Sequence, residues 1–376
     1  MLSKKWQAGL LAIACGTGLA HAEEIKIGYV TGLTGPIAMT ANEGLTMARG
    51  YIEQVNAQGG INGNKITLVA KDDHYDATKT AGLIDEAITK DGVVAFVNTA
   101  GTANTLAIIK SGTLNKYKVP LLGVFSGSEA IRGAGSEQIF HTRPSYNDEV
   151  FKIARIVSTL GLKKVAVFYQ DDGFGASIND SIARAAQEHK FDVILKTSYK
   201  SGETNFTKQA KEIIAVQPQA IFLMGVPEAV MHFMKAYDAP TGASQIYTLS
   251  FVPPKLLIDF AGESRVRGLA ITQVVPNPVG GSLQLAKEYQ ALLASPYGKG
   301  TVASPLNFEN YMNMRLMMEA LKTAGAKPTP EKITQALKGM RNYRIGGFAI
   351  DFGDTNRRGS SFLDIAVISM NGRLAY

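Results

Sequence analysis

The chain has very little cysteine: of its 376 residues only Cys15 is a cysteine, and it lies close to the start. Lys4 and Lys5 precede an apolar run from Trp6 to Leu19, which ends in Ala20-His21-Ala22. A basic start, an apolar stretch of this length and an A-x-A site are typical of a secretory signal peptide. We therefore predict export with cleavage after Ala22, which leaves a chain that forms no disulfide.

Long hydrophobic runs are also missing. The N-terminal apolar run is shorter than the roughly 20 residues that a membrane-spanning helix needs, and no later segment approaches that length. We expect a soluble mature protein. An alternative is a lipoprotein anchored through Cys15, although Ala12-Ile13-Ala14 lack the leucine expected three residues before such a cysteine.

The chain has no concentrated charge of one sign. Its net charge is +7, and loss of Lys4 and Lys5 with the signal leaves +5. The basic pairs Lys163-Lys164 and Arg357-Arg358 sit at expected turns without interleaved aromatic residues. Nucleic-acid binding requires a clustered basic stripe, so we predict no nucleic-acid partner.

Motifs for catalysis or metal binding are lacking as well. The four histidines beyond the signal form no H-x-H or H-x-x-x-H pair, and Asp72-Asp73-His74-Tyr75-Asp76 is predicted to be a helix cap at Asp76 with solvated neighbours. Gly173-Phe174-Gly175 is followed by Ile178 where a dinucleotide fingerprint needs glycine. Neither a P-loop nor a G-x-S-x-G elbow occurs. We predict a protein that is not an enzyme and uses no cofactor or metal.

What the chain does contain is a regular alternation of strands and helices. This alternation predicts parallel sheets with helices on both faces, in two α/β units. Ligand sites in such sheets lie at the carboxyl ends of strands, so we expect a small ligand in the cleft between the units. The expected strands are 25–30, 65–69, 93–97, 120–125, 165–169, 193–197, 220–224, 246–249 and 268–275. The expected helices are 77–89, 178–187, 206–216 and 229–236. A further helix is expected to start in a capping box at Thr40 and to stop at Gly59-Gly60.

One strand-to-helix junction stands out, at residues 97–105. The strand ending at Val97 runs through small and hydroxyl residues into a helical pattern that starts near Thr102. The first turn of a helix has unpaired N–H groups and a partial positive charge, which suits a carboxylate. The alternative is that Thr99 or Thr102 simply caps the helix.

The sequence then resembles a known family. Five segments carry the resemblance. They are residues 27–36, the segment Asn56-Ala57-Gln58-Gly59-Gly60-Ile61-Asn62-Gly63-Asn64-Lys65, Asp72-Asp73, and residues 169–175 and 261–264. In this order they resemble the Leu/Ile/Val-binding family of type I periplasmic binding proteins. The resemblance implies two doubly wound parallel-sheet lobes joined by three crossover strands. It places lobe 1 at residues 23–143 plus 273–352 and lobe 2 at residues 144–272 plus 353–376.

The resemblance also implies ligand contacts, position by position. The hydroxyl that binds the ligand carboxylate falls on Thr102. A second hydroxyl, which contacts both the carboxylate and the amine of the ligand, falls on Ser126. The remaining positions are backbone contacts at Ala100, Gly101 and Val124, a first-lobe loop at Thr40, an aromatic lid at Phe174, a second-lobe contact at Val226, and Leu306 or Phe308 near the side-chain pocket.

The chain departs from that family in one place. Ser250, followed by Phe251, falls where amino-acid binders have an acid that receives the ligand ammonium. An unpartnered buried ammonium is costly, by several kcal/mol. Either Glu228 or Glu309 replaces that acid, or the ligand has no amine. The alternative for Glu228 is a charge in the first turn of a helix, where the helix dipole favours it, and the alternative for Glu309 is a solvated side chain.

These features predict a monomeric periplasmic substrate-binding protein that delivers a small carboxylate to an ABC transporter permease. Its ligand is either a branched-chain or other amino acid, or an aromatic or aliphatic organic acid. The ligand-sensing module of a signalling system is the alternative function, and a secreted enzyme is a third class.

Overall fold

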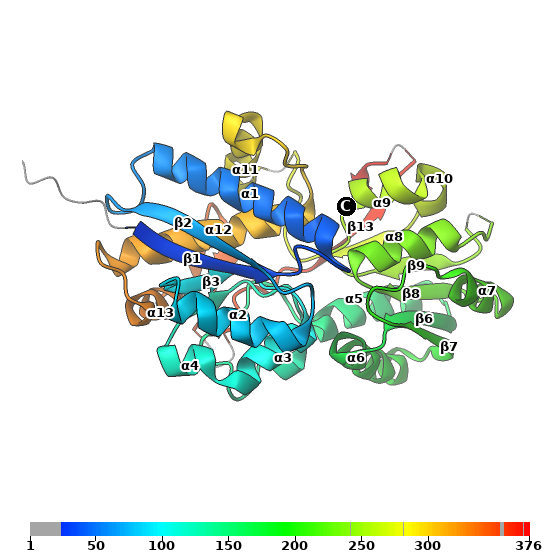
Figure 1. The fold of residues 1–376 in the computed structure, drawn as a ribbon. Coiled ribbons are helices and arrows are strands. Elements are labelled where there is room, and N and C mark those ends of the chain that lie inside the picture. Colours follow the sequence, from blue (N-terminus) through cyan, green and yellow to red (C-terminus); the bar gives the residue numbers. More distant parts are fainter. Residues whose placement is uncertain (1–23, 241, 281, 354–356, 371) are drawn as a thin grey trace, which may run out of the picture.

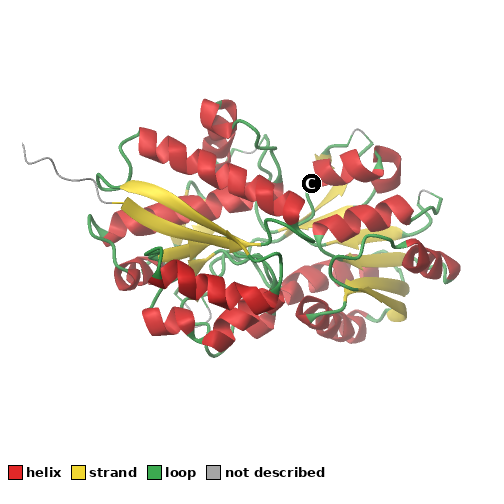
Figure 2. Ribbon diagram, viewed as in Figure 1, coloured by secondary structure: helices red, strands yellow, loops and turns green. Residues whose placement is uncertain are grey.

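A computed structural model describes residues 24–240, 242–280, 282–353, 357–370 and 372–376. Figures 1 and 2 show two lobes side by side, each a β-sheet with helices on both faces. The proposed signal peptide and Cys15 lie outside the described residues. No helix in the described part of the chain is long and apolar enough to cross a membrane.

The first lobe is built on a five-stranded parallel sheet in the order β2-β1-β3-β4-β5. Apolar side chains on both faces bury these strands under helices, as parallel sheets require. The strands are β1 (Glu24–Thr31), β2 (Lys65–Asp72), β3 (Ala95–Val97), β4 (Leu121–Leu122) and β5 (Ile139–Phe140). The helices are α1 (Ala38–Ala57), α2 (Ala77–Thr89), α3 (Thr102–Ser111), α4 (Thr113–Tyr117), α11 (Gln284–Ala294), α12 (Pro305–Ala324) and α13 (Pro330–Lys338), with the 3₁₀ turns Glu129–Ile131 and Pro296–Gly298 and the hairpin β11 (Tyr343–Ile345)–β12 (Phe348–Ile350).

The second lobe is built on a seven-stranded sheet in the order β14-β13-β10-β9-β8-β6-β7. The strands β6 to β10 pair in parallel, but β13 pairs antiparallel with both of its neighbours, β10 and β14, which makes this sheet mixed where the sequence predicted a parallel one. The strands are β6 (Lys164–Gln170), β7 (Asp192–Tyr199), β8 (Ala220–Met224), β9 (Gln245–Thr248), β10 (Ala270–Gln273), β13 (Asp364–Ile368) and β14 (Leu374–Ala375). The helices are α5 (Tyr146–Thr159), α6 (Gly173–His189), α7 (Thr207–Ala215), α8 (Pro227–Ala236), α9 (Pro254–Ala261) and α10 (Glu263–Val266).

The chain passes between the two lobes three times: between β5 and α5, between β10 and α11, and between β12 and β13. A bridge between His141 and Arg358 ties the first passage to the third. The fold class that the sequence predicted, two α/β lobes with helices on both sides of each sheet, is therefore confirmed.

Helix α1 begins differently from its prediction. It starts at Ala38, two residues before Thr40, and its N-cap is Ile37, which offers no capping group. The Thr40 hydroxyl donates to the Ile37 carbonyl instead of capping (3.1 Å). The capping box predicted at Thr40 is wrong because a carboxylate from the other lobe, Glu228, binds the first-turn N–H groups in its place.

Candidate functional site

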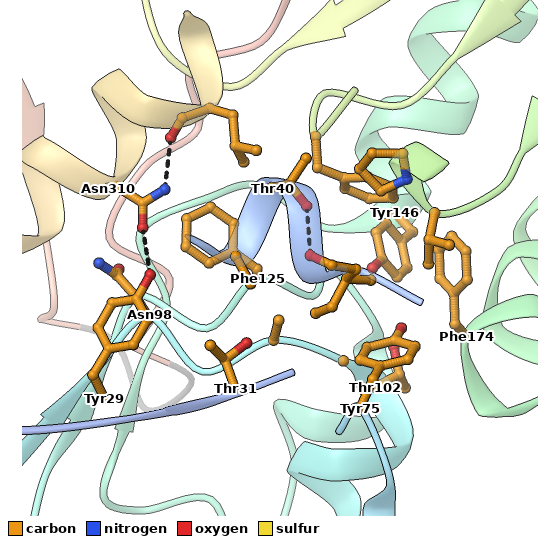
Figure 3. Close-up of a pocket in the computed structure, with 18 residues that line it drawn as sticks. Tyr29, Thr31, Thr40, Tyr75, Asn98, Thr102, Phe125, Tyr146, Phe174 and Asn310 are labelled. Atoms are coloured by element: carbon orange, nitrogen blue, oxygen red, sulfur yellow. Dashed lines mark hydrogen bonds between the residues drawn. The ribbon is translucent and has the colours of Figure 1, made fainter. Parts of the chain in front are cut away.

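A pocket lies between the two lobes, at the carboxyl ends of the first-lobe strands. It contains about 600 Å³ free of protein atoms, part of it open to solvent. Figure 3 shows the eighteen residues that line it. From the first lobe and the loops that leave it come Tyr29, Thr31, Ile37, Thr40, Ala41, Tyr75, Asn98, Ala100, Gly101, Thr102, Phe125, Leu306 and Asn310, and from the second lobe Tyr146, Phe174, Val226, Pro227 and Phe251.

The junction after β3 forms one wall of this pocket. Thr102 is the first residue of α3 and only 1% exposed, and its hydroxyl lies 2.8 Å from that of Ser126. The helix is capped by Gly101, with no side-chain cap, so the alternative that Thr99 or Thr102 caps it is wrong. The first intrahelical bond is donated by Thr105 to Gly101. The N–H groups of the residues before Thr105 therefore precede the helical hydrogen bonds and favour an anion there.

Gly101 allows this geometry. Its φ is +100°, a region that side chains other than glycine avoid. A Cβ atom at this position would lie 2.4 Å from Asn104 Oδ1 and 2.9 Å from the Tyr75 ring. The junction is therefore closely packed against Tyr75, which forms the adjoining wall.

The loop between β2 and α2 holds Tyr75 over the pocket. His74 and Tyr75 both have left-handed backbones, with φ near +57° and +58°. Asp73 fixes the turn: its carboxylate accepts the Tyr75 N–H (2.9 Å) and the Thr80 hydroxyl (2.7 Å), and it also accepts an amide hydrogen of Asn104 (3.1 Å). Asp73 is fully buried, which corrects the prediction of solvated neighbours around Asp76.

The predicted cap at Asp76 is confirmed, because its side chain accepts the Thr78 N–H. Among the described residues, no group of three or more His, Cys, Asp or Glu side chains is placed to hold a metal ion.

The second lobe contributes an aromatic wall. Tyr146, Phe174 and Phe251 meet edge to face, with ring centroids 5.3 Å apart for Tyr146 and Phe174, and 5.7 Å for Phe174 and Phe251. Asp172 caps α6 by accepting the N–H groups of Phe174 and Gly175, which fixes the backbone at Phe174. Such rings bury a planar apolar ligand well, because aromatic pairs favour edge and offset contacts.

No carboxylate or cationic side chain belongs to the eighteen lining residues, all of which the structure describes. Burial raises the pKa of Tyr29, Tyr75 and Tyr146, so these three phenols stay neutral. The polar groups that face a ligand are therefore hydroxyls, amides and the start of α3. The site can hold an anion through hydrogen bonds, and it presents no charged partner to an ammonium.

Ser250 does not line the pocket. It is buried, and its N–H donates to Glu149 Oε2 (3.0 Å). The Thr272 hydroxyl donates to the same carboxylate oxygen. Burial raises the pKa of Glu149, and the charge of Arg143 opposes that effect. Glu149, the acid that Ser250 contacts, does not line the pocket either.

The two candidate replacement acids have other partners. Glu309 forms a fork-shaped ion pair with Arg143, with contacts of 2.9 and 2.5 Å, and both side chains are buried. The Arg143 guanidinium also lies 5.3 Å from the centre of the Phe125 ring and 5.7 Å from that of Phe251, behind the pocket wall. Glu309 is therefore neutralised outside the pocket.

Glu228 connects the lobes. Its Oε1 accepts the N–H groups of Met39 (3.0 Å) and Thr40 (3.4 Å) at the start of α1, although Glu228 itself belongs to α8. Burial raises its pKa to about 7. The prediction of a favourable charge in a first helical turn therefore describes part of its role, because the carboxylate contacts the N-termini of two helices.

Only some of the predicted site residues line the pocket. Ser126 does not line the pocket, but it is hydrogen-bonded to two residues that do, Thr102 and Tyr146. Val124 and Phe308 belong to the hydrophobic core, so Leu306 is the alternative that lines the pocket. The predicted residues that line it are Thr40, Ala100, Gly101, Thr102, Phe174, Val226, Phe251 and Leu306; those that sequence reasoning missed are Tyr29, Thr31, Ile37, Ala41, Tyr75, Asn98, Phe125, Tyr146, Pro227 and Asn310.

Two α/β lobes, three connections between them and a pocket lined by residues of both lobes define a ligand-binding architecture. The periplasmic binding protein family model matches residues 24–373, and the chain belongs to this family. Its relatives include "Leu/Ile/Val-binding protein homolog 8" of Brucella abortus, 22% identical over 370 residues, which cover 92% of this chain and 89% of that protein.

Solved structures share the fold. A substrate-binding periplasmic protein from Ralstonia solanacearum is 30% identical, with a TM-score of 0.88, over 93% of this chain and 99% of the other. A solute-binding protein of an ABC transporter from R. palustris, solved in complex with benzoate, is 14% identical, with a TM-score of 0.80, over 94% and 95% of the two chains. At that identity the second likeness concerns the fold alone.

Proposed function

We propose that this protein is the substrate-binding subunit of an ABC importer and captures a small organic acid that has no amino group. The observation that carries the proposal is the pairing of an anion-binding junction at Thr102 with a lining that contains no acid. A carboxylate placed there receives the Thr102 hydroxyl and the first N–H groups of α3.

The charge balance favours an acid over an amino acid. An ammonium beside the carboxylate would lose its water shell without an anionic partner, which costs several kcal/mol. Glu149, Glu228 and Glu309 do not line the pocket. Each accepts hydrogen bonds from other groups, although Glu149 Oε1 and Glu228 Oε2 have no partner among the described residues. The aromatic walls suit a ring or a compact apolar chain. The R. palustris protein, which shares the fold, was solved in complex with benzoate.

Binding of the ligand favours closure of the two lobes. The lining comes from both lobes, so a ligand gains its full set of contacts only when the lobes are closed. Delivery of the ligand to the permease then follows when the lobes reopen.

We further propose that the protein is exported, is cleaved after Ala22 and acts as a monomer with the lobe boundaries given above.

Paired ligands that differ by one amino group test this function. The protein, expressed with its own N-terminus, purified from the periplasm and freed of ligand by unfolding and refolding, is titrated calorimetrically with 3-phenylpropanoate and phenylalanine. The pair 4-methylpentanoate and leucine is titrated in the same way. We expect the member without the amine to bind more tightly in each pair. Tighter binding of phenylalanine or leucine would refute the proposal.

A further inference from the structure

A second group of polar side chains lies at the opposite end of the same pocket from Thr102. Figure 3 shows Tyr29, Asn98 and Asn310 together on one side, and Thr102, Tyr75, Tyr146 and Phe174 on the other. This group, here called the amide end, comprises Tyr29, Asn98 and Asn310, all three buried and all three lining the pocket. The carboxylate-binding junction does not use it.

The hydrogen bonds of the amide end are incomplete. Asn98 is 1% exposed, and its Oδ1 accepts an amide hydrogen of Asn313 (2.8 Å), but its Nδ2 has no partner among the described residues. The Tyr29 hydroxyl donates to Asn310 Oδ1 over a long distance of 3.5 Å, which leaves its lone pairs available. A buried polar atom without a partner costs about 1–3 kcal/mol, so these atoms are suited to a partner that enters the pocket.

The surrounding backbone is shaped to hold these side chains. A Cβ atom at Gly44 would lie 2.8 Å from the Tyr29 hydroxyl and 3.0 Å from Asn310 Nδ2. At Gly123, where φ is +72°, a Cβ atom would lie 2.2 Å from the amide of Asn313. Asn98 itself has a left-handed backbone with φ of +60°. Two glycines therefore leave room for the amides that position Tyr29 and Asn98.

The two available atoms of the amide end are complementary to a hydroxyl group of a ligand. The Asn98 amide supplies a donor and the Tyr29 oxygen supplies an acceptor, and one hydroxyl both accepts and donates. If the amides of Asn98 and Asn313 were both turned over, Asn98 would present its oxygen instead, and a hydroxyl would still satisfy it. A second carboxylate does not fit, because no cation lines this end and the phenol of Tyr29 stays neutral.

We propose that the amide end is a hydroxyl-binding subsite, and that the ligand is a hydroxylated aromatic acid whose hydroxyl lies opposite its carboxylate. This inference rests on the proposed function, since the carboxylate at Thr102 sets the orientation. Phe125 lies between the two ends, and Tyr146, Phe174 and Phe251 form the aromatic wall on the Thr102 side, so aromatic side chains border the space that the ring would occupy.

Calorimetry with two ligand series tests the subsite. One series is benzoate, 4-methylbenzoate and 4-hydroxybenzoate, and the other is cinnamate, 4-methylcinnamate and 4-hydroxycinnamate. We expect the hydroxylated acid of at least one series to bind about ten-fold more tightly than both of its analogues, as one buried hydrogen bond allows. The methyl analogues fill the same space, so they separate hydrogen bonding from packing.

Two variants locate the hydroxyl. Tyr29→Phe removes only the phenol oxygen, and Asn98→Gly removes the amide while it permits the left-handed backbone. In each variant we expect the ratio of the two affinities, hydroxylated over methylated, to fall to near one. Tyr289→Phe is the matched control, because Tyr289 is a buried tyrosine of the same lobe that does not line the pocket; there the ratio stays as in the unaltered protein.

The outcomes are distinct. Equal or weaker binding of the hydroxylated acids overturns the subsite and leaves the proposed function standing. A hydroxyl preference that survives in both variants also overturns it, because the hydroxyl then binds elsewhere. If none of the six acids binds and leucine or phenylalanine does, the proposed function itself is refuted, and the subsite with it.

Discussion

Replacing the Thr102 hydroxyl by a methyl group is the sharpest test of the carboxylate-binding junction. The Thr102→Val substitution keeps the branched shape of the side chain at the first position of α3. It removes the only side-chain hydroxyl that lines the pocket at the start of that helix. The backbone N–H groups and the helix dipole remain, so the change in affinity reports the loss of the Thr102 hydroxyl, which is also hydrogen-bonded to Ser126.

The expected loss follows from the character of that bond. A hydrogen bond to a charged group contributes about 1.5–3 kcal/mol, and each 1.4 kcal/mol is a factor of about ten in affinity. We therefore expect the affinity for the tightest-binding acid to fall about ten- to hundred-fold. The fold should tolerate the change, because Ser126 keeps a second hydrogen bond, from the Ser128 N–H (3.3 Å).

Calorimetric titration measures the loss, and thermal unfolding of the ligand-free protein shows whether the lobe stays intact. Thr102→Ser is the matched control, because it retains the hydroxyl and should bind almost as tightly as the unaltered protein. If Thr102→Val binds the acid as tightly as Thr102→Ser, the carboxylate does not lie at this junction and the reasoning is wrong.

Three further predictions concern the buried acids. Ser250→Glu places a second carboxylate beside Glu149, so we expect a lower melting temperature and no gain of leucine binding; a gain in calorimetry would show that Ser250 does face the ligand. Glu228 has a pKa of about 7 in the folded protein against an ordinary 4.5, so the unfolded chain loses its proton first and stability falls by up to about 3 kcal/mol between pH 4.5 and 7. Glu228→Gln should remove that slope in melting curves taken across this range, and an unchanged slope would contradict the assignment. Arg143→Leu leaves Glu309 buried and unpaired and should cost about 3–5 kcal/mol in denaturant unfolding, and adding Glu309→Leu should restore most of it; no recovery in the double variant would mean that packing, not charge, sets the loss.

The regular part of the fold could be predicted from the sequence because local signals define it. Helix α2 begins after its Asp76 cap and ends where expected, and strand β8 matches its predicted range. Helix α12 has local signals at its ends, the Ser304 cap followed by Pro305 and the stop at Gly325, but it has no periodic pattern between them. Fifteen of its twenty residues are buried, so no polar face marks its period, and it was not predicted.

The binding site was only half predictable, for a physical reason. The junction at Thr102 is encoded locally, as a strand followed by small residues and a helix. Tyr75 enters the pocket through two left-handed residues held by Asp73, whose partners Thr80 and Asn104 lie on two different helices. The pair of Arg143 and Glu309 joins residues 166 positions apart. Such contacts exist only after the lobes fold, so sequence spacing does not reveal them.

The central claim, a carboxylate bound without an amine, is tested most directly by the molecule that the protein itself retains. Protein purified from its own periplasm without refolding is denatured, and the released small molecules are identified by mass spectrometry. The account predicts a carboxylic acid that has no amino group and carries an aromatic hydroxyl. Release of leucine, valine or another amino acid in stoichiometric amount would contradict it.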